Sequence, residues 1–345
     1  GILNKYHVEH TPVEVNIHMV KSEQEAIQYL LSWIQKPINL AKAPAIQFTL
    51  LPQSHHEVIL GILGHHILLD DSAWQPIFTQ LSQNYAQLDG VLTASNSHIE
   101  LSSKIPAKVL VNSQNALQYW KTIFPTGLNQ LDWPKFCRAP NVQASIIQYG
   151  QNTIFDYEQK AVRCSSSIPL KGLKQLSERA QASIFHTVVA QFGGYLNHLF
   201  GTQSIDLFVP IVEQYEASSL SQIRSSSNIL PIRILRPEYS EQESNIENKE
   251  KESIVNVRNQ ILQGMVHNIS IEQILSATKT KRNTIPNVLV TQFIDGSQFL
   301  KLEQVETSTL IIPPIHSDYD LTLAFQIKAD EIHFELTTGE KLSKK

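Results

Sequence analysis

The chain has 345 residues, of which 42% are hydrophobic and 17% charged, so it can bury a sizeable core and lacks the polar excess of a disordered protein. This length is too great for one compact core and fits two domains. Its 28 basic and 32 acidic residues give a formal net charge of −4, which excludes a broad basic field that would collect nucleic acid.

In the first half of the chain, strand-like and helix-like periodicity alternate. Ser22 followed by Glu25 is typical of a helix N-cap, and Pro37 ends the apolar stripe that follows. The Ser-, Thr- and Asn-rich stretch 92–104 indicates a loop. The strands expected here are 13–20, 45–51, 58–65, 144–149 and 161–166, and the helices are 23–36, 73–88 and 115–123.

The second half continues the alternation and predicts an α/β fold of two lobes, residues 1–166 and 167–345, each a sheet backed by helices. Gly201 ends the longest expected helix in the manner of a C-terminal cap. The remaining expected elements are helices from about 168 and over 183–200 and 254–266, strands 204–210, 228–235, 288–293 and 309–313, a loop at 218–227, a charged solvated insertion at 238–252, and a final hairpin of 321–328 and 331–336.

Targeting and redox signals are absent from this pattern. The apolar runs fall short of the roughly 20 residues that a bilayer helix needs, and no charged-then-apolar leader follows Gly1. Cys137 and Cys164 are too few for a disulfide framework, and we expect reduced thiols. We therefore expect a cytoplasmic protein that binds neither nucleic acid nor membranes.

The segment that carries chemistry runs from His65 to Asp71. It places two imidazoles, His65 and His66, at the end of an expected buried strand, and two carboxylates, Asp70 and Asp71, at the start of an expected helix. A neutral histidine can accept a proton from an attacking amine or hydroxyl, and a carboxylate can hold such a loop through an arginine or backbone N–H groups. The spacing is also compatible with two histidines hydrogen-bonded in a core turn that an aspartate caps.

Other chemistries lack sequence support. Neighbouring residues of a strand point to opposite faces, so His65 and His66 are not expected to share a metal ion. His55 and His56 lie in a polar turn and are expected at the surface. The sequence contains no Gly-x-Ser-x-Gly, Gly-x-Gly-x-x-Gly or phosphate-loop motif. We expect no metal and no intrinsically bound cofactor.

Five motifs, in order along the chain, resemble the condensation domains of nonribosomal peptide synthetases. The segment from His65 to Asp71 resembles the HHxxxDG signature, with Asp71 where the family has glycine. These motifs cover nearly the whole chain and are more specific than the histidine pair alone. The flanking matches are Pro37-Ile38-Asn39-Leu40 with Ala43-Pro44-Ala45, Tyr119-Trp120, Asn228-Ile229-Leu230-Pro231-Ile232-Arg233, and Tyr319-Asp320-Leu321-Thr322-Leu323.

The resemblance implies two lobes related to chloramphenicol acetyltransferase, arranged as a V-shaped pseudo-dimer with a central tunnel. It implies an acyltransferase of secondary metabolite and antibiotic biosynthesis that forms an amide between a donor thioester and the amine of an acceptor thioester. Both substrates would arrive on the phosphopantetheine arms of donor and acceptor carrier proteins, and neighbouring synthetase domains would be partners. The tunnel would make the aminolysis local and keep water away.

The resemblance also implies roles for single residues. His66 would be the central base or hydrogen-bond acceptor, while His65 and Asp70 would be structural. Trp74 keeps the Asp-x-x-x-Trp spacing of the related epimerisation domains. Asn228, Arg233 and Asp320 would belong to the motifs that line the site.

Departures from the family pattern leave alternatives open. Asp71 replaces a glycine that allows any backbone angle, and Gln214 stands where the family often has an arginine. Arg233 or Arg224 would then pair with Asp70. These departures keep open a non-catalytic docking or recruitment domain, or an epimerising or ester-forming relative, although the second lobe lacks the EGHGR-like run of epimerisation domains. We also expect a member shortened at both ends.

Overall fold

The computed structural model describes residues 15–40, 46–66, 69–88, 113–133, 147–149, 152–157, 161–212, 227–236, 246–293, 296–310, 312 and 317–339. Its contacts divide the chain into two compact units, each assembled from segments distant in sequence. The first unit comprises Gly1–Lys108, Gln214–Ser226 and Asp295–Pro314, and the second comprises Val109–Glu213, Ser227–Ile294 and Ile315–Lys345. Expectations for 92–104 and 218–226, and for Cys137, Gln214 and Arg224, fall outside the described residues.

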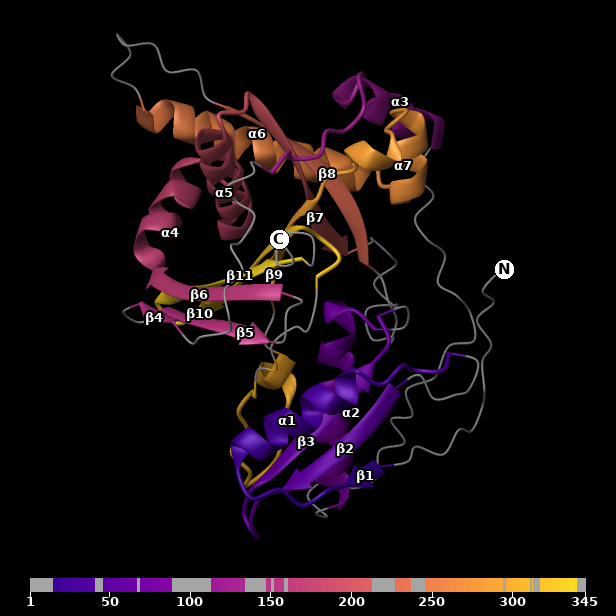
Figure 1. The fold of residues 1–345 in the computed structure, drawn as a ribbon, viewed down its shortest axis with the longest axis vertical. Helices are drawn as coiled ribbons and strands as arrows, with labels where there is room; N and C mark the ends of the chain where they lie inside the picture. Colours follow the sequence, from indigo (N-terminus) through magenta and orange to yellow (C-terminus); the bar gives the residue numbers. More distant parts are fainter. Residues whose placement is uncertain are drawn as a thin grey trace. The chain divides into compact units, whose positions relative to one another are not determined.

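The first unit contains a three-stranded sheet in the order β1-β2-β3, with β1 parallel to β2 and β2 antiparallel to β3 (Figure 1). The side chain of Ser22 accepts a hydrogen bond from the Glu25 backbone N–H at 3.2 Å, which confirms the expected helix start. The elements of this unit are β1 (Val15–Ile17), α1 (Glu23–Ile34), β2 (Ile46–Pro52), β3 (Val58–Gly64), α2 (Asp71–Leu88) and the 3-10 helix η4 (Gly296–Phe299).

A small core joins α1 to this sheet. It is built from Val20, Ala26, Leu30, Trp33 and Leu51, and Leu310 and Ile312 pack against it. The strand expected at 309–313 is wrong, because residues 309, 310 and 312 have no strand conformation. The apolar side chains of Leu310 and Ile312 pack against this core, which explains why the sequence pattern predicted a buried strand there.

The second unit contains an eight-stranded sheet in the order β4-β5-β6-β11-β10-β9-β7-β8 (Figure 1). The pairings of β9 with β10 and with β7 are parallel, and the other pairings are antiparallel. The strands are β4 (Ile147–Tyr149), β5 (Asn152–Tyr157), β6 (Ala161–Pro169), β7 (Ser204–Val212), β8 (Ser227–Leu235), β9 (Val288–Gln292), β10 (Leu321–Lys328) and β11 (Glu331–Thr338).

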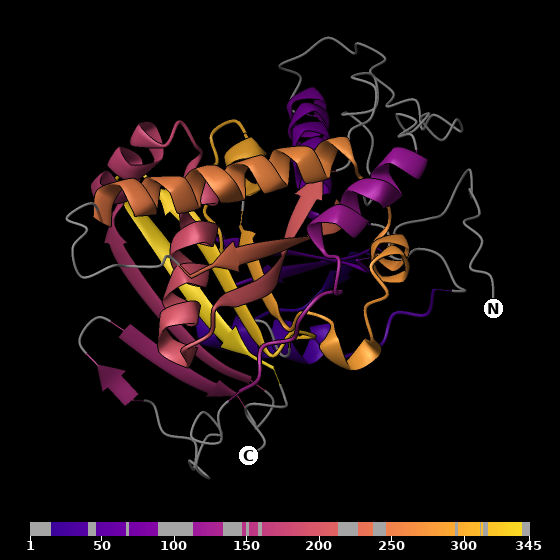
Figure 2. The ribbon, with the colours of Figure 1, turned by 90° about the horizontal axis from the view of Figure 1, so that it is seen from above.

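Helices cover one face of this sheet. α4, α5 and α6 pack on one another, α5 lies on β7 and β8, and α6 lies on β8 (Figures 1 and 2). Gly201 adopts the left-handed conformation with φ 65° at the end of α5, as expected of a helix C-terminus. The helices of this unit are α3 (Ser113–Ile123), α4 (Leu170–Arg179), α5 (Ile184–Phe200), α6 (Ile246–Val266), α7 (Ile271–Ala277) and the 3-10 helix η3 (Arg282–Thr284).

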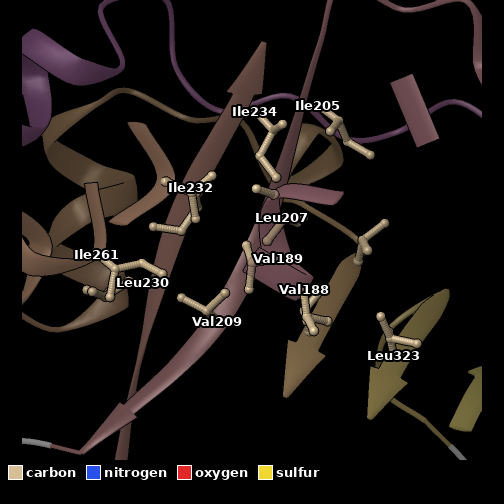
Figure 3. Close-up of a cluster of buried hydrophobic side chains, with 14 of the residues drawn as sticks. Val188, Val189, Ile205, Leu207, Val209, Leu230, Ile232, Ile234, Ile261 and Leu323 are labelled. Carbon is tan, nitrogen blue, oxygen red and sulfur yellow. The ribbon is translucent and has the colours of Figure 1, made fainter. Parts of the chain in front are cut away.

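The core of the second unit lies between the helices and the sheet. Alternate residues of β7 and β8 point into it, as the period of a strand requires, and meet Val188 and Val189 of α5 (Figure 3). The strand residues that share this face are Ile205, Leu207, Val209, Leu230, Ile232 and Ile234. This layering confirms the α/β class.

Some boundaries differ from the sequence expectations. Helix α6 begins at Ile246, inside the stretch expected to be a solvated insertion. The sequence did not predict this start because the first turns of the helix are charged and lack an apolar stripe. Helix α7 and strand β5 were not expected. The expected lobe boundary after residue 166 lies within β6. This strand pairs with β5 and β11 of the second unit.

In the described part of the chain, no helix combines the length and the hydropathy that crossing a membrane requires. The V-shaped pairing and the central tunnel concern the placement of the two units relative to each other and stay predictions.

Candidate functional site

The histidine pair lies in the turn that joins β3 to α2. Strand β3 ends at Gly64, and the backbone N–H of Leu69 donates to the carbonyl of His65 at 3.2 Å. His65 is half-buried and His66 is exposed. The turn therefore leaves His66 more exposed than His65.

The ring of His66 is held by the turn itself. Its Nδ1 lies 2.7 Å from the carbonyl oxygen of Leu69. A carbonyl can only accept a hydrogen bond, so Nδ1 carries the hydrogen and the neutral ring keeps its lone pair on Nε2. This tautomer leaves Nε2 able to accept a proton or a hydrogen bond.

The other end of the turn is fixed by Leu69 and Asp70. The Leu69 side chain is 4% exposed and packs over Gly64, in the space that a side chain at position 64 would need. Asp70 is 3% exposed, and its carbonyl accepts from the Ala73 N–H at 3.0 Å, where α2 begins. Asp70 thus lies in the buried base of the loop, and its role as a structural residue stays a prediction.

Asp71 is the first residue of α2. A helical residue has negative φ, so the backbone here takes an L-residue as readily as glycine. Its side chain lies outside what the structure describes, and the effect of this replacement on activity stays a prediction.

Trp74 lies one turn into α2 and is half-buried. Its ring stacks on Phe78 with centroids 5.9 Å apart and planes at 25°. Both side chains press on Gly296 of η4, where a Cβ would lie 2.8 Å from Phe78 Cε2 and 3.3 Å from Trp74 Cβ. The contacts of Trp74 are those of a packing residue that joins α2 to η4.

Arg233 pairs with Asp206, a carboxylate that the sequence analysis did not single out. The guanidinium donates from Nε and Nη2 to the two Asp206 oxygens, each at 2.7 Å, and from Nη2 to the Gly127 carbonyl at 3.1 Å. The hydrogen bonds of Asp206 raise the pKa of Arg233, against the lowering effect of burial. Of the two arginines expected to pair with Asp70, Arg233 is thus held by Asp206, and Arg224 lies outside the described residues.

Asn228 joins the start of β8 to the turn between α6 and α7. Its Nδ2 donates to Asn268 Oδ1 at 2.6 Å and to the Ile269 carbonyl at 2.8 Å, and its Oδ1 accepts from the Ile229 N–H at 2.8 Å. Every polar atom of its side chain is engaged within the second unit. The structure gives Asn228 a structural role.

Asp320 is buried immediately before β10 and organises a polar cluster. One of its carboxylate oxygens accepts from Trp133 Nε1 at 3.0 Å and from Asn287 Nδ2 at 2.7 Å. Next to it, burial and the charge of Asp318 raise the pKa of Tyr319 to about 12. Tyr319 is therefore neutral at physiological pH.

The Tyr119-Trp120 motif is also structural. Trp120 is buried and donates from Nε1 to the His267 carbonyl at 3.0 Å, and Tyr119 stacks on the His267 ring with centroids 4.3 Å apart. The pair holds α3 against the end of α6.

The expected site residues thus divide between the units. The first unit holds the residues of the connection between β3 and α2 and of the first turn of α2, namely His65, His66, Asp70, Asp71 and Trp74. The second unit holds Asn228, Arg233 and Asp320, whose contacts lie within that unit. Asp206 was missed, although a lone carboxylate between Ile205 and Leu207 in an apolar strand signals a buried partner. Among the described residues, no three His, Cys, Asp or Glu side chains gather as a metal site requires.

No known family model matches the chain. Among curated proteins, it is 28% identical over 190 residues to a hybrid PKS-NRPs synthetase of Penicillium oxalicum, covering 54% of this chain and 4% of that protein. It is 22% identical over 302 residues to malpinin synthetase of Mortierella alpina, covering 84% of this chain and 4% of that protein. The chain thus spans about 4% of the length of the curated relatives that it matches.

Solved structures resemble the chain over almost its whole length. The first condensation domain of the calcium-dependent antibiotic synthetase superposes with a TM-score of 0.66 at 14% identity, covering 96% of this chain and 71% of that one. The condensation domain of the Monacolin K polyketide synthase MokA gives 0.68 at 13%, covering 96% and 75%. The X-domain from teicoplanin biosynthesis gives 0.66 at 14%, with the same coverages of 96% and 75%.

These superpositions place the chain in the α/β class of folds. Within that class, the chain has the fold of a nonribosomal peptide synthetase condensation domain. The resemblance drawn from the five sequence motifs is confirmed at the level of the fold.

Proposed function

We propose that the chain is a condensation domain that forms an amide between a donor acyl or aminoacyl thioester and the amine of an acceptor aminoacyl thioester. One observation carries the proposal. The exposed ring of His66, at the end of β3 in a condensation-domain fold, is held through Nδ1 so that Nε2 can accept a proton. The similarity to two synthetases supports the same class of reaction.

In the proposed reaction, the acceptor amine attacks the carbonyl carbon of the donor thioester. A C–N bond forms and the C–S bond breaks, which releases the donor carrier's thiol. Nε2 of His66 accepts the proton that the amine loses and passes it to the departing sulfur, so His66 returns to its neutral form and the overall step is balanced. The carbonyl of Leu69 holds the Nδ1 hydrogen of His66 and stabilises the positive charge on the ring when Nε2 is protonated.

The loop residues around His66 would support this step without contacting the substrate. His65 closes the turn through its carbonyl, and Asp70 lies buried where α2 begins. The substrates would be carried on phosphopantetheine arms, so the proposed partners are donor and acceptor carrier proteins together with neighbouring synthetase domains. The arm supplies the thioester, and the chain needs no cofactor of its own for this chemistry.

Replacing His66 by Ala tests the proposal. We expect amide formation from two loaded carriers in a single turnover to fall by about 10²-fold or more, because the proton acceptor is lost. His55→Ala is the matched control, because His55 lies in the exposed turn between β2 and β3 and should leave the rate unchanged.

Wild-type rates in His66→Ala would overturn the role of His66. If the wild type binds both loaded carriers and forms no amide, the enzymatic function is wrong and a docking role is favoured instead.

A further inference from the structure

The turn between β3 and α2 contains a packing contact that reaches the His66 ring through one residue. We infer that Gly64 and Leu69 are positioning residues for His66, because the packing of Leu69 over Gly64 holds the carbonyl that selects the Nδ1–H tautomer. The consequence for catalysis rests on the proposed function, whereas the consequence for the tautomer does not.

Leu69 holds the turn through its backbone. Its N–H donates to the carbonyl of His65 at 3.2 Å, and its own carbonyl accepts from Nδ1 of His66 at 2.7 Å. Both histidines are therefore hydrogen-bonded to the backbone of Leu69, His65 to its N–H and His66 to its carbonyl. A shift of the Leu69 backbone would lengthen both hydrogen bonds together.

The position of Leu69 depends in turn on Gly64. A Cβ at position 64 would overlap Cδ1 of Leu69, closer than real Cβ atoms come, and would lie 3.0 Å from Cγ. Leu69 is 4% exposed, so moving its side chain aside would take a buried apolar group out of its packing. A side chain at position 64 therefore forces the Leu69 side chain to shift, whereas glycine leaves it in place.

The tautomer of His66 follows from this arrangement. Without a carbonyl near Nδ1, the neutral ring is free to carry its hydrogen on Nε2, and a protonated Nε2 cannot accept a hydrogen from an amine. The ring also gains freedom to rotate. Both effects lower the fraction of molecules with the Nε2 lone pair directed at the substrate.

The test uses Gly64→Ala, Leu69→Ala and the double variant. The ¹⁵N shifts of the His66 ring nitrogens report which of them carries the hydrogen, and the His66 signals among the 13 histidines are those missing from His66→Ala. We expect the Nδ1–H form to predominate in the wild type and to be reduced in both single variants. In the double variant the new methyl group occupies the space that Leu69 vacates, so the Nδ1–H form should recover beyond the sum of the single effects.

Amide formation gives a second readout. We expect kcat to fall by about 10-fold to 10²-fold in Gly64→Ala, as for a displaced catalytic group, with KM for the loaded carriers unchanged. The matched control is Gly61→Ala, three residues earlier on β3, where a Cβ would lie 2.6 Å from Thr49 Cγ2 and 2.9 Å from Leu30 Cδ2. Gly61→Ala should lower stability and leave the His66 tautomer unchanged. Its kcat, corrected for the fraction of folded protein, should equal that of the wild type.

The inference is wrong if Gly64→Ala keeps the wild-type tautomer, if Gly61→Ala changes it as much, or if the single effects simply add. If Gly64→Ala does not fold, the tautomer is measured in Leu69→Ala alone. A wild-type tautomer in Leu69→Ala would then contradict the inference. An inactive wild type would contradict the proposed function and leave the tautomer measurement as valid as before.

Discussion

Arg233 and Asp206 are paired residues of β8 and β7, and they form an ion pair inside the second unit. The Asp206 side chain is fully buried and that of Arg233 is 19% exposed. The Asn129 N–H also donates to Asp206 at 2.8 Å, and the guanidinium carbon lies 4.9 Å from the centre of the Phe124 ring. The pair therefore fixes the segment that follows α3 to the sheet.

Replacing Arg233 by Met should destabilise the second unit. The change leaves a buried carboxylate without its cation, which typically costs about 3–5 kcal/mol of unfolding free energy. The double change Asp206→Leu with Arg233→Met should recover most of that loss, because no uncompensated charge remains. Urea unfolding measures both, and a single variant as stable as the wild type would contradict the structural role of the pair.

The sequence could predict the loop that carries His65, His66 and Asp70, but not the partners of the charged residues. The spacing of His65, His66 and Asp70 is local, so the motif identifies it. The pairing of Arg233 with Asp206 depends on strand register across 27 residues, which local patterns do not reveal. The motifs predicted that Arg233, Asn228 and Asp320 belong to the site. Their contacts in the structure connect segments of the second unit.

At the level of elements, α5 begins with a capping box that contains a histidine. The Ser183 side chain accepts from the His186 N–H at 3.2 Å, and the Ser183 N–H donates to His186 Nδ1 at 3.1 Å. Burial, and then the charge of Arg258, lower the pKa of His186. Arg258 itself donates to the carbonyls of Ala180 and Gln181 at the end of α4.

Protonation of His186 should loosen the start of α5. Because its pKa is lower in the folded state, the unfolded chain takes up the proton first, so this contribution is complete above about pH 6.5 and is lost as the pH falls below it. His186→Gln keeps a capping side chain that does not titrate. Between about pH 7.5 and about pH 5.5, Tm should fall more for the wild type than for His186→Gln. Equal decreases would contradict the role of His186.

Elements with a clear apolar stripe or cap were predictable, and the others were not. Ser22, Gly201 and the turn before Glu331 mark their elements in the sequence, and the structure places α1, α5 and the β10–β11 hairpin there. The start of α6 was missed because its first turns carry charges that face solvent, including Glu247, which pairs with Arg179 at 3.4 Å. Tertiary packing, rather than local periodicity, decides such segments.

At the scale of the whole molecule, the described residues form two separate hydrophobic cores. One is centred on Leu51 and belongs to the first unit, and the other includes Leu207 and belongs to the second. Each core draws on segments that are far apart in the sequence. This is why a boundary in the chain, such as residue 166, does not coincide with the bounds of either unit.

Separate cores predict separate local stabilities. Leu51 and Leu207 are both fully buried, so replacing either by Ala should cost about 2–5 kcal/mol through lost burial and a cavity. We expect Leu51→Ala to speed amide hydrogen exchange in α1, β2 and β3 alone, and Leu207→Ala to speed it in α5, β7 and β8 alone, because each change destabilises the cooperative unit that contains it. Exchange followed by mass spectrometry resolves these peptides, and each variant serves as the control for the other. Faster exchange in both sets of elements from either single change would show that the two cores unfold as one.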